Sequence, residues 1–282
     1  MTAYNREAYI AESIKSVLAS SFKDFELIIV DDGSTDNTVA IADSFVQQDS
    51  RVCIHINEQN IGDYPNRNRA ASLARGKYLK YVDSDDIIYP HGLEIMLAAM
   101  EKFPDAGFGF SDVRNEPANT LPRKYSGDEA LRIHFLNGGL LLAGPGSSII
   151  RKDAFDRMGG FSGKRFISDY EAWLYLCLRY PVVIFSSGLT WLRAHEGQEN
   201  DVGKLAYYSL NYNLHRDFIL DTDNPFSIAE RKKIVYNYRI LLGRRIYQRL
   251  LKCYGLKKTI RTIKDSGETY LVFLWAFMPM KK

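Results

Sequence analysis

Apolar residues recur along the N-terminal half of the chain in two alternating patterns. Ile10, Ile14 and Val17 have the spacing of one helix face, and Asn5 is placed to cap that helix. The run from Phe25 to Val30 is short and mainly apolar, which is typical of a buried strand. Further helices are expected over residues 37–48, 66–74 and 90–103, and further strands over 52–56, 78–82 and 108–110. This alternation predicts an α/β fold with a mostly parallel sheet flanked by helices.

Two later regions depart from the alternation. Residues 113–148 are rich in proline and glycine, so we expect loops that shape a binding pocket there. From about Val202 onward the sequence becomes helical and rich in tyrosine. We therefore expect two domains, an α/β domain over residues 1–201 and a helical C-terminal extension over 202–282.

Charge is distributed unevenly between these two regions. The net charge is +3, but residues 231–264 contain twelve Lys and Arg and no Asp or Glu. Such a segment can be a solvated helical surface, a nucleic-acid patch or a face attracted to anionic lipid. Its interleaved Ile, Leu and Tyr, and the apolar run over 270–277, favour peripheral contact with an anionic membrane. No nucleic-acid-binding motif accompanies it, so no nucleic-acid partner is expected.

Cysteine usage and hydropathy indicate the cellular location to expect. The three cysteines are far apart and form no CxxC pair, so neither a disulfide framework nor a zinc site is suggested. No stretch reaches the roughly 18 apolar residues that a membrane-spanning helix needs. We expect a cytoplasmic protein that contacts the inner face of the cytoplasmic membrane from one side.

Carboxylates follow two of the predicted strands. Asp31 and Asp32 end one strand, and Asp83, Asp85 and Asp86 end another. Ligands bind beyond the carboxyl ends of strands in open parallel sheets, and Mg²⁺ or Mn²⁺ prefers oxygen ligands. Alternate residues of an extended strand end would point the same way, which suits a shared cation. The alternative, that these aspartates only end strands and cap helices, stays open for each cluster by itself.

Five segments occur together in the order and spacing of one enzyme family. They are Thr2-Ala3-Tyr4-Asn5, Asp31-Asp32-Gly33-Ser34, Asn60-Ile61-Gly62, Arg67-Asn68 and Asp83-Ser84-Asp85-Asp86. Over residues 1 to about 200 the chain resembles the family 2 glycosyltransferases. The resemblance implies a GT-A fold, a Rossmann-like nucleotide-diphospho-sugar transferase architecture.

The resemblance also assigns roles to individual residues. It implies that a nucleotide sugar is bound by residues Ala3, Tyr4, Asp31, Asp32, Arg67 and Asp83. It implies that Asp85 is a ligand of the metal, Mn²⁺ or Mg²⁺. For Arg67, a structural salt bridge is an open alternative, and Asp83 can stand on the ribose side or the metal side.

Ser168-Asp169-Tyr170-Glu171-Ala172-Trp173 is similar to the family's Glu-Asp-Trp-Asp-x-Trp stretch, which makes Asp169 the expected general base. Ser168 stands where the family usually has Glu, so the role of that Glu is altered or absent. Asp169 could instead cap the helix that follows it. His195 matches a position where related enzymes often place a histidine beside the metal or diphosphate, although a lone histidine is often structural.

The implied reaction is inverting transfer of one sugar, by default from a UDP-sugar, to a hydroxyl of a saccharide or lipid-linked acceptor. Surface polysaccharide or lipopolysaccharide synthesis is the expected context. The chain lacks the Gln-x-x-Arg-Trp motif, which argues against a processive synthase. Two other classes remain: a catalytically impaired nucleotide-sugar-binding protein, suggested by Ser168, and a nucleotidyltransferase, which would need a Gly-rich basic phosphate loop.

Family members place an apolar strand before the Thr-x-Tyr-Asn stretch, whereas here Met1 occupies its last position. We therefore expect the first strand to be truncated, with about 5 to 8 strand residues upstream.

Overall fold

The computed structural model describes residues 1–111, 121–195, 204–221, 223–251, 256–269 and 271–280. The chain forms two compact units, one of residues 1–134 and 139–194 and the other of 135–138 and 195–282. The boundary predicted between Asp201 and Val202 lies outside the described residues, and it stays a prediction.

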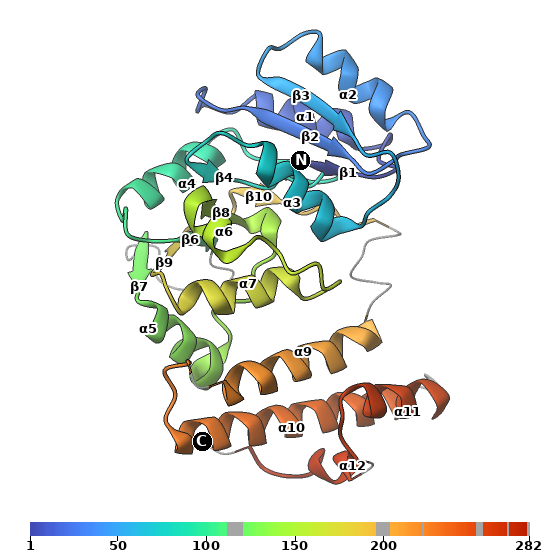
Figure 1. Cartoon of the computed structure of the whole chain (residues 1–282), viewed down its shortest axis with the longest axis vertical. Helices are drawn as coiled ribbons and strands as arrows, with labels where there is room; N and C mark the ends of the chain where they lie inside the picture. Colours follow the sequence, from blue (N-terminus) through green and yellow to red (C-terminus); the bar gives the residue numbers. More distant parts are fainter. Residues whose placement is uncertain (112–120, 196–203, 222, 252–255, 270, 281–282) are drawn as a thin grey trace. The chain divides into compact units, whose positions relative to one another are not determined.

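The first unit begins with a parallel sheet of β1 (Thr2–Ala3), β2 (Leu27–Asp31) and β3 (Val52–Ile56), in that order. All five residues of β2 are buried, as expected for a strand covered on both faces. Figure 1 shows this layer with α1 (Ile10–Leu18) and α2 (Thr38–Val46). Ile10, Ile14 and Ile29 are fully buried in one apolar cluster, which fixes α1 against the sheet.

The second sheet of this unit is mixed. Its strand order is β4-β8-β6-β9-β7, and among its pairs only β6 and β9 run parallel. A separate antiparallel pair joins β5 and β10. The bounds are β4 Tyr78–Leu79, β5 Ile87–Ile88, β6 Phe108–Ser111, β7 Arg123–Tyr125, β8 Ser148–Arg151, β9 Val182–Phe185 and β10 Thr190–Trp191. The Phe108 ring stacks on Trp173 with centroids 5.4 Å apart, which ties this sheet to α7.

The remaining helices of the first unit are α3 Asp63–Leu73, α4 Gly92–Glu101, α5 Gly127–Arg132, α6 Lys152–Met158 and α7 Ser168–Cys177, with a 3₁₀ turn over Pro145–Ser147. A π-helical turn over Ile133–Gly138 follows α5 at the unit boundary. The predicted α/β fold with flanking helices is confirmed.

Three local predictions are wrong. Asn5 caps no helix, because α1 begins at Ile10 and Asn5 has a φ of 50° in a tight loop. The strand expected over 78–82 pairs only at Tyr78 and Leu79. Within the region expected to be loops, 113–148, the described residues include β7, α5 and the π-helical turn; residues 112–120 lie outside the description.

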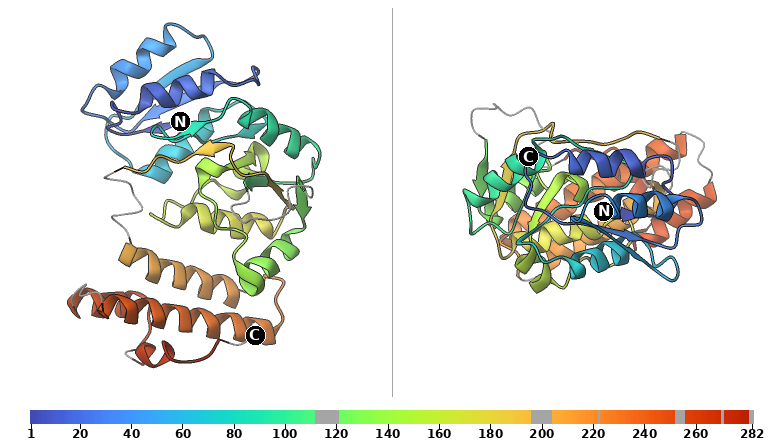
Figure 2. Two further views of the ribbon diagram at one scale, coloured as in Figure 1. Left: turned by 180° about the vertical axis from the view of Figure 1, so that it is seen from behind. Right: turned by 90° about the horizontal axis from the view of Figure 1, so that it is seen from above.

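The second unit consists mainly of helices: α9 Lys204–Leu220, α10 Ile228–Leu251, α11 Leu256–Asp265 and α12 Val272–Trp275. α9 and α10 lie side by side in both Figure 1 and Figure 2. Tyr212, Leu242 and Ile263 bury their side chains in one cluster that joins α9, α10 and α11. In the described parts of the chain, every helix is too short or too polar to cross a lipid bilayer.

Candidate active site

The loops that follow β1 and β2 are locked together by hydrogen bonds. The Asn5 amide donates to Ser34 Oγ at 2.8 Å, and the Thr35 amide donates to Asn5 Oδ1 at 2.9 Å. The φ of 50° at Asn5 turns the chain so that both contacts form. Ala3 is buried beside this loop pair, whereas the Tyr4 side chain is 44% exposed. Of Ala3 and Tyr4, both predicted to contact the nucleotide, only Tyr4 is accessible.

Asp31 and Asp32 are buried and hold loop backbone. Asp31 Oδ1 accepts the amides of Gly33 and Ser34, at 3.1 and 2.8 Å. Asp32 accepts the amides of Ile61 and Gly62, both at 2.9 Å, and thereby fixes the segment before α3. The structure accounts for these two carboxylates as loop supports, and their predicted nucleotide contact stays a prediction.

The acidic run that was expected to continue a strand forms a turn instead. The Asp86 amide donates to the Asp83 carbonyl at 3.0 Å, so the aspartates do not alternate as on a strand. Asp83 pairs with Arg67 Nη1 at 2.7 Å, and Arg67 Nε pairs with Asp63 at 2.9 Å. Burial alone would raise the pKa of Asp83, but Arg67 lowers it below its usual value. Arg67 is only 7% exposed and forms the structural salt bridge that the sequence left open as an alternative.

Two arginines hold the other side of the same turn. Arg6 Nε donates to Asp85 Oδ2 at 2.9 Å. Arg193 donates through Nε to the Asp85 carbonyl and through its amide to Asp86 Oδ1, both at 2.9 Å. Burial, with the neighbouring negative charges, raises the pKa of Asp86 to about 6 despite the Arg193 amide. Sequence reasoning did not identify Arg6 or Arg193, because nothing in their spacing places them beside the aspartates.

Asp169 lies in the first turn of α7 and is not its cap, since the cap position is Ile167. Its Oδ1 accepts the Tyr64 hydroxyl and the Tyr170 amide, each at 2.8 Å. Burial raises the pKa of the Asp169 carboxyl, and these two hydrogen bonds oppose the shift. A carboxylate with a raised pKa is a better proton acceptor than an ordinary surface aspartate.

A glycine-rich loop links Asp169 to the acidic turn. A methyl group built on Gly144 would lie 3.9 Å from Asp169 Oδ2. One built on Gly146 would lie 3.7 Å from Oδ2 of both Asp83 and Asp86. Lys80 Nζ donates to the Gly146 carbonyl and so fixes the loop beside the acidic turn. The predicted base and the acidic turn, far apart in sequence, therefore border one short loop.

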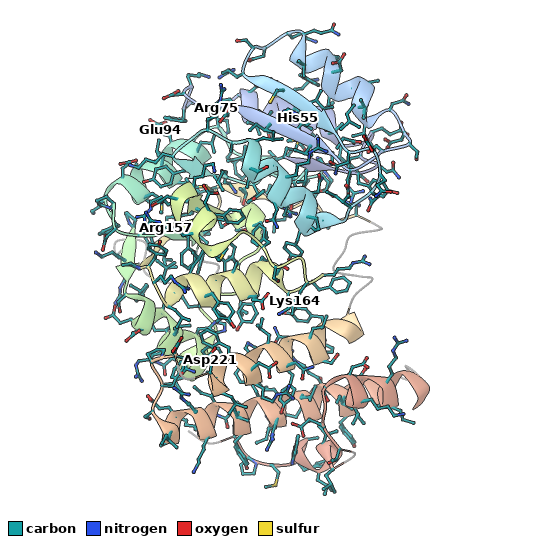
Figure 3. All side chains as sticks on the ribbon, in the orientation of Figure 1. His55, Arg75, Glu94, Arg157, Lys164 and Asp221 are labelled. Carbon is teal, nitrogen blue, oxygen red and sulfur yellow. The ribbon has the colours of Figure 1, made fainter. Side chains whose placement is uncertain are left out.

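Ser168, the position that departs from the family pattern, is fully buried. Its Oγ donates to the Lys164 carbonyl at 2.9 Å and contacts Ser162 Oγ at 3.0 Å. Lys164, labelled in Figure 3, pairs its Nζ with Glu171 Oε1 at 2.6 Å. Ser168 thus closes the turn before α7 while Asp169 keeps its place in the site.

The acidic turn carries the type of ligand that a divalent cation binds. Asp83, Asp85 and Asp86 offer the carboxylate oxygens that Mg²⁺ and Mn²⁺ prefer, and such ions often use only one or two protein carboxylates. No group of three or more His, Cys, Asp or Glu converges as an all-protein metal cage within the described residues. His195 belongs to the second unit, so its predicted metal contact stays a prediction.

Sequence comparison relates this chain to known glycosyltransferases. The profile of glycosyl transferase family 2 matches residues 1–159. Glycosyltransferase GlyG of Streptococcus pneumoniae serotype 4 is 28% identical over 210 residues, 69% of this chain and 69% of GlyG. Several further relatives are matched over half or less of their own length.

Two solved structures share the fold. S. aureus TarS 1–349 in complex with UDP-GlcNAc aligns with a TM-score of 0.71 at 20% identity, covering 94% of this chain and 78% of that one. Mannosyltransferase PcManGT from Pyrobaculum calidifontis, in complex with GDP-Man and Mn²⁺, aligns with a TM-score of 0.66 at 14% identity, covering 97% and 76%. The chain is therefore a GT-A-fold member of glycosyl transferase family 2.

Proposed function

We propose that this glycosyltransferase is an inverting, metal-dependent hexosyltransferase that moves one sugar from a nucleotide sugar, UDP-linked by default, to an acceptor hydroxyl. The observation that carries the proposal is the loop of Gly144 and Gly146, which faces Asp169 on one side and Asp83 with Asp86 on the other. Direct displacement at a sugar carbon needs a base for the incoming hydroxyl and a separate group that binds the departing diphosphate. Asp169 and the acidic turn, on either side of this loop, suit these two roles.

In the proposed reaction, Asp169 accepts the proton of the acceptor hydroxyl. The acceptor oxygen then forms its bond to the anomeric carbon while the bond to the diphosphate oxygen breaks, and the electron pair leaves with the nucleoside diphosphate. Tyr64 and the Tyr170 amide orient the Asp169 carboxylate through their hydrogen bonds. Asp85 would hold Mn²⁺ or Mg²⁺, which when bound neutralises charge on the departing diphosphate. The Mn²⁺ in the PcManGT complex supports a divalent cation as the cofactor.

The donor is proposed from the ligands of two related structures, and the acceptor from the exposed apolar surface described below. The UDP-GlcNAc of the TarS complex supports a UDP-sugar, and the GDP-Man of PcManGT makes a GDP-sugar the first alternative to test. The acceptor is proposed to be a saccharide or a lipid-linked saccharide of surface polysaccharide or lipopolysaccharide synthesis.

The test is an incubation of the purified chain with Mn²⁺, a panel of UDP- and GDP-sugars and candidate acceptors, with nucleoside diphosphate release as the readout. Release that needs both metal and Asp169 supports the proposal, and the donor that gives it is identified. NMR of the product should show the anomeric configuration opposite to that of the donor. Retained configuration would exclude direct displacement.

An exposed apolar surface in the second unit supports a lipid-linked acceptor. Its exposed apolar residues are Leu271, Leu274, Phe277, Met278 and Met280. α12 buries Val272 against the helical core, which leaves Leu271 and Leu274 61% and 63% exposed. Arg244 of α10 donates to the Met278 carbonyl at 3.0 Å, so the basic helix borders this surface. Tyr270, part of the apolar run in the sequence, lies outside the described residues.

We expect this surface to contact anionic lipid through its apolar side chains and the basic residues beside them. Co-sedimentation with vesicles that contain anionic lipid should fall for Leu274→Ser combined with Phe277→Ser. The matched control is Ile95→Ser, an exposed apolar residue of α4 in the first unit. If wild type, the double variant and Ile95→Ser bind the vesicles equally, this surface does not contact the membrane.

A further inference from the structure

Arg6 makes an ion pair that the proposed reaction does not explain. Its Nε lies 2.9 Å from Oδ2 of Asp85, the carboxylate proposed to hold the metal. The two residues are 79 positions apart in the sequence. Their side chains are 29% and 16% exposed, so the pair lies at an edge that a ligand can reach.

The rest of Arg6 is held in place by its own loop. Nη1 donates to the carbonyls of Tyr4 and Asn5, both at 3.1 Å. The Arg6 amide donates to Thr38 Oγ1 at 2.7 Å. Arg6 is therefore a positioned cation between the exposed Tyr4, a proposed nucleotide contact, and the acidic turn.

The charge of Arg6 conflicts with a metal ion at the same carboxylate. A divalent cation coordinates a carboxylate oxygen at roughly 2.0 to 2.2 Å, well inside the distance at which a guanidinium binds that oxygen. Two cations in contact with one oxygen repel each other. Metal binding at Asp85 Oδ2 therefore weakens the contact with Arg6, and the positive charge of Arg6 then favours another anion nearby.

We propose that Arg6 is the resident counter-ion of Asp85, which competes with the divalent cation and passes to the diphosphate when metal and donor bind together. The inference rests on the proposed function, because it takes Asp85 as the metal side of a diphosphate site. Its consequence is ordered binding: metal alone binds weakly, and metal with nucleoside diphosphate binds cooperatively.

The test measures Mn²⁺ binding directly, from the EPR signal of free Mn²⁺, for the wild-type chain and Arg6→Met. Methionine keeps an apolar stem of similar length and removes the charge. Without nucleotide, Arg6→Met should bind Mn²⁺ up to about fivefold more tightly, because the loss of a partly exposed competing pair is worth at most about 1 kcal/mol. With saturating Mn²⁺, UDP should bind Arg6→Met more weakly than it binds wild type.

Controls separate this role from a structural one. Arg75→Met removes another arginine, labelled in Figure 3, that pairs with Glu26 away from the acidic turn, and it should change neither affinity. Arg6→Lys should restore part of both effects. In an Asp85→Asn background, Arg6→Met should no longer tighten Mn²⁺ binding.

Three outcomes would overturn the inference. If Arg6→Met weakens Mn²⁺ and UDP binding together, with a lower midpoint of thermal unfolding, Arg6 only shapes its loop. If Mn²⁺ binding without nucleotide is unchanged and UDP binding falls, Arg6 is a phosphate contact and not a competitor. If Mn²⁺ binding tightens equally in the Asp85→Asn background, the competition is not at Asp85. If neither UDP nor GDP binds the wild-type chain, the proposed function fails, and the titration with Mn²⁺ alone still decides the role of Arg6.

Discussion

Tyr64→Phe is the perturbation whose effect on the proposed base can be worked out most fully. The Tyr64 hydroxyl donates to Asp169 Oδ1 at 2.8 Å and lowers the pKa of that carboxyl by favouring its charged form. A hydrogen bond to a charged group contributes about 1.5 to 3 kcal/mol, and 1.36 kcal/mol corresponds to about one pKa unit. The Tyr170 amide remains as a second donor, so we expect the pKa of Asp169 to rise by about one unit.

The assay is the pH dependence of kcat/KM for sugar transfer. Asp169 must be deprotonated to accept the acceptor proton, so activity falls as the pH drops through its pKa. In Tyr64→Phe this acidic limb should move upward by about one pH unit, with the rate at high pH within about tenfold of wild type. Tyr81→Phe is the matched control, because its buried hydroxyl donates to the Arg67 carbonyl at 3.1 Å and not to Asp169. If the acidic limb stays in place in Tyr64→Phe, or moves equally in Tyr81→Phe, the Tyr64 hydroxyl does not set the pKa of the catalytic base.

Three further predictions concern stability, each measured by urea unfolding. Gly127→Ala would place its methyl group 1.7 Å from the Cys177 carbonyl oxygen and should lower the free energy of unfolding by about 3 kcal/mol. Gly76→Ala is the control, because its methyl group would lie 3.4 Å from the nearest atom, and it should lower that free energy by less than half as much. Asp32→Ala removes the acceptor of the Ile61 and Gly62 amides and should cost about 2 to 4 kcal/mol. Arg67→Met removes the ion pair of Asp83 and should lower the free energy of unfolding by about 3 kcal/mol at pH 7. Because Arg67 lowers the pKa of Asp83 in the folded protein, this difference from wild type should shrink as the pH falls below about 4 and Asp83 becomes protonated. A cost that does not shrink in acid would show that the charge of Asp83 is not its cause.

The sequence predicted the elements whose burial pattern is strong. β3 was placed at its observed bounds, and α1 was predicted from the apolar spacing of Ile10, Ile14 and Val17, which pack on one face. α5 was missed, although Ser126 and Glu129 form a capping box that marks its start. β4 was predicted too long, because Tyr81 and Val82 are buried without pairing in a sheet.

For the candidate site, the sequence supplied the carboxylates but not their partners. Asp85 and Asp169 could be chosen because the segments around them resemble motifs of the family 2 glycosyltransferases, whereas acidic residues after a strand or at a helix start do not indicate chemistry by themselves. Arg6 and Tyr64 could not, because their contacts depend on how distant loops fold together. Arg67 shows the same limit: its residue type suits a phosphate as well as a carboxylate, and only the fold brings it to Asp83.

If Asp169 is the base of the transfer, Asp169→Asn removes the step on which the reaction depends. Asparagine keeps the size of the side chain but cannot accept the acceptor proton. The measurement is the single-turnover rate of sugar transfer together with donor affinity, for wild type and Asp169→Asn. With Asp169 as the base, we expect the rate to fall by about 10² to 10⁴ while donor affinity stays within about threefold of wild type. A rate within tenfold of wild type would contradict it.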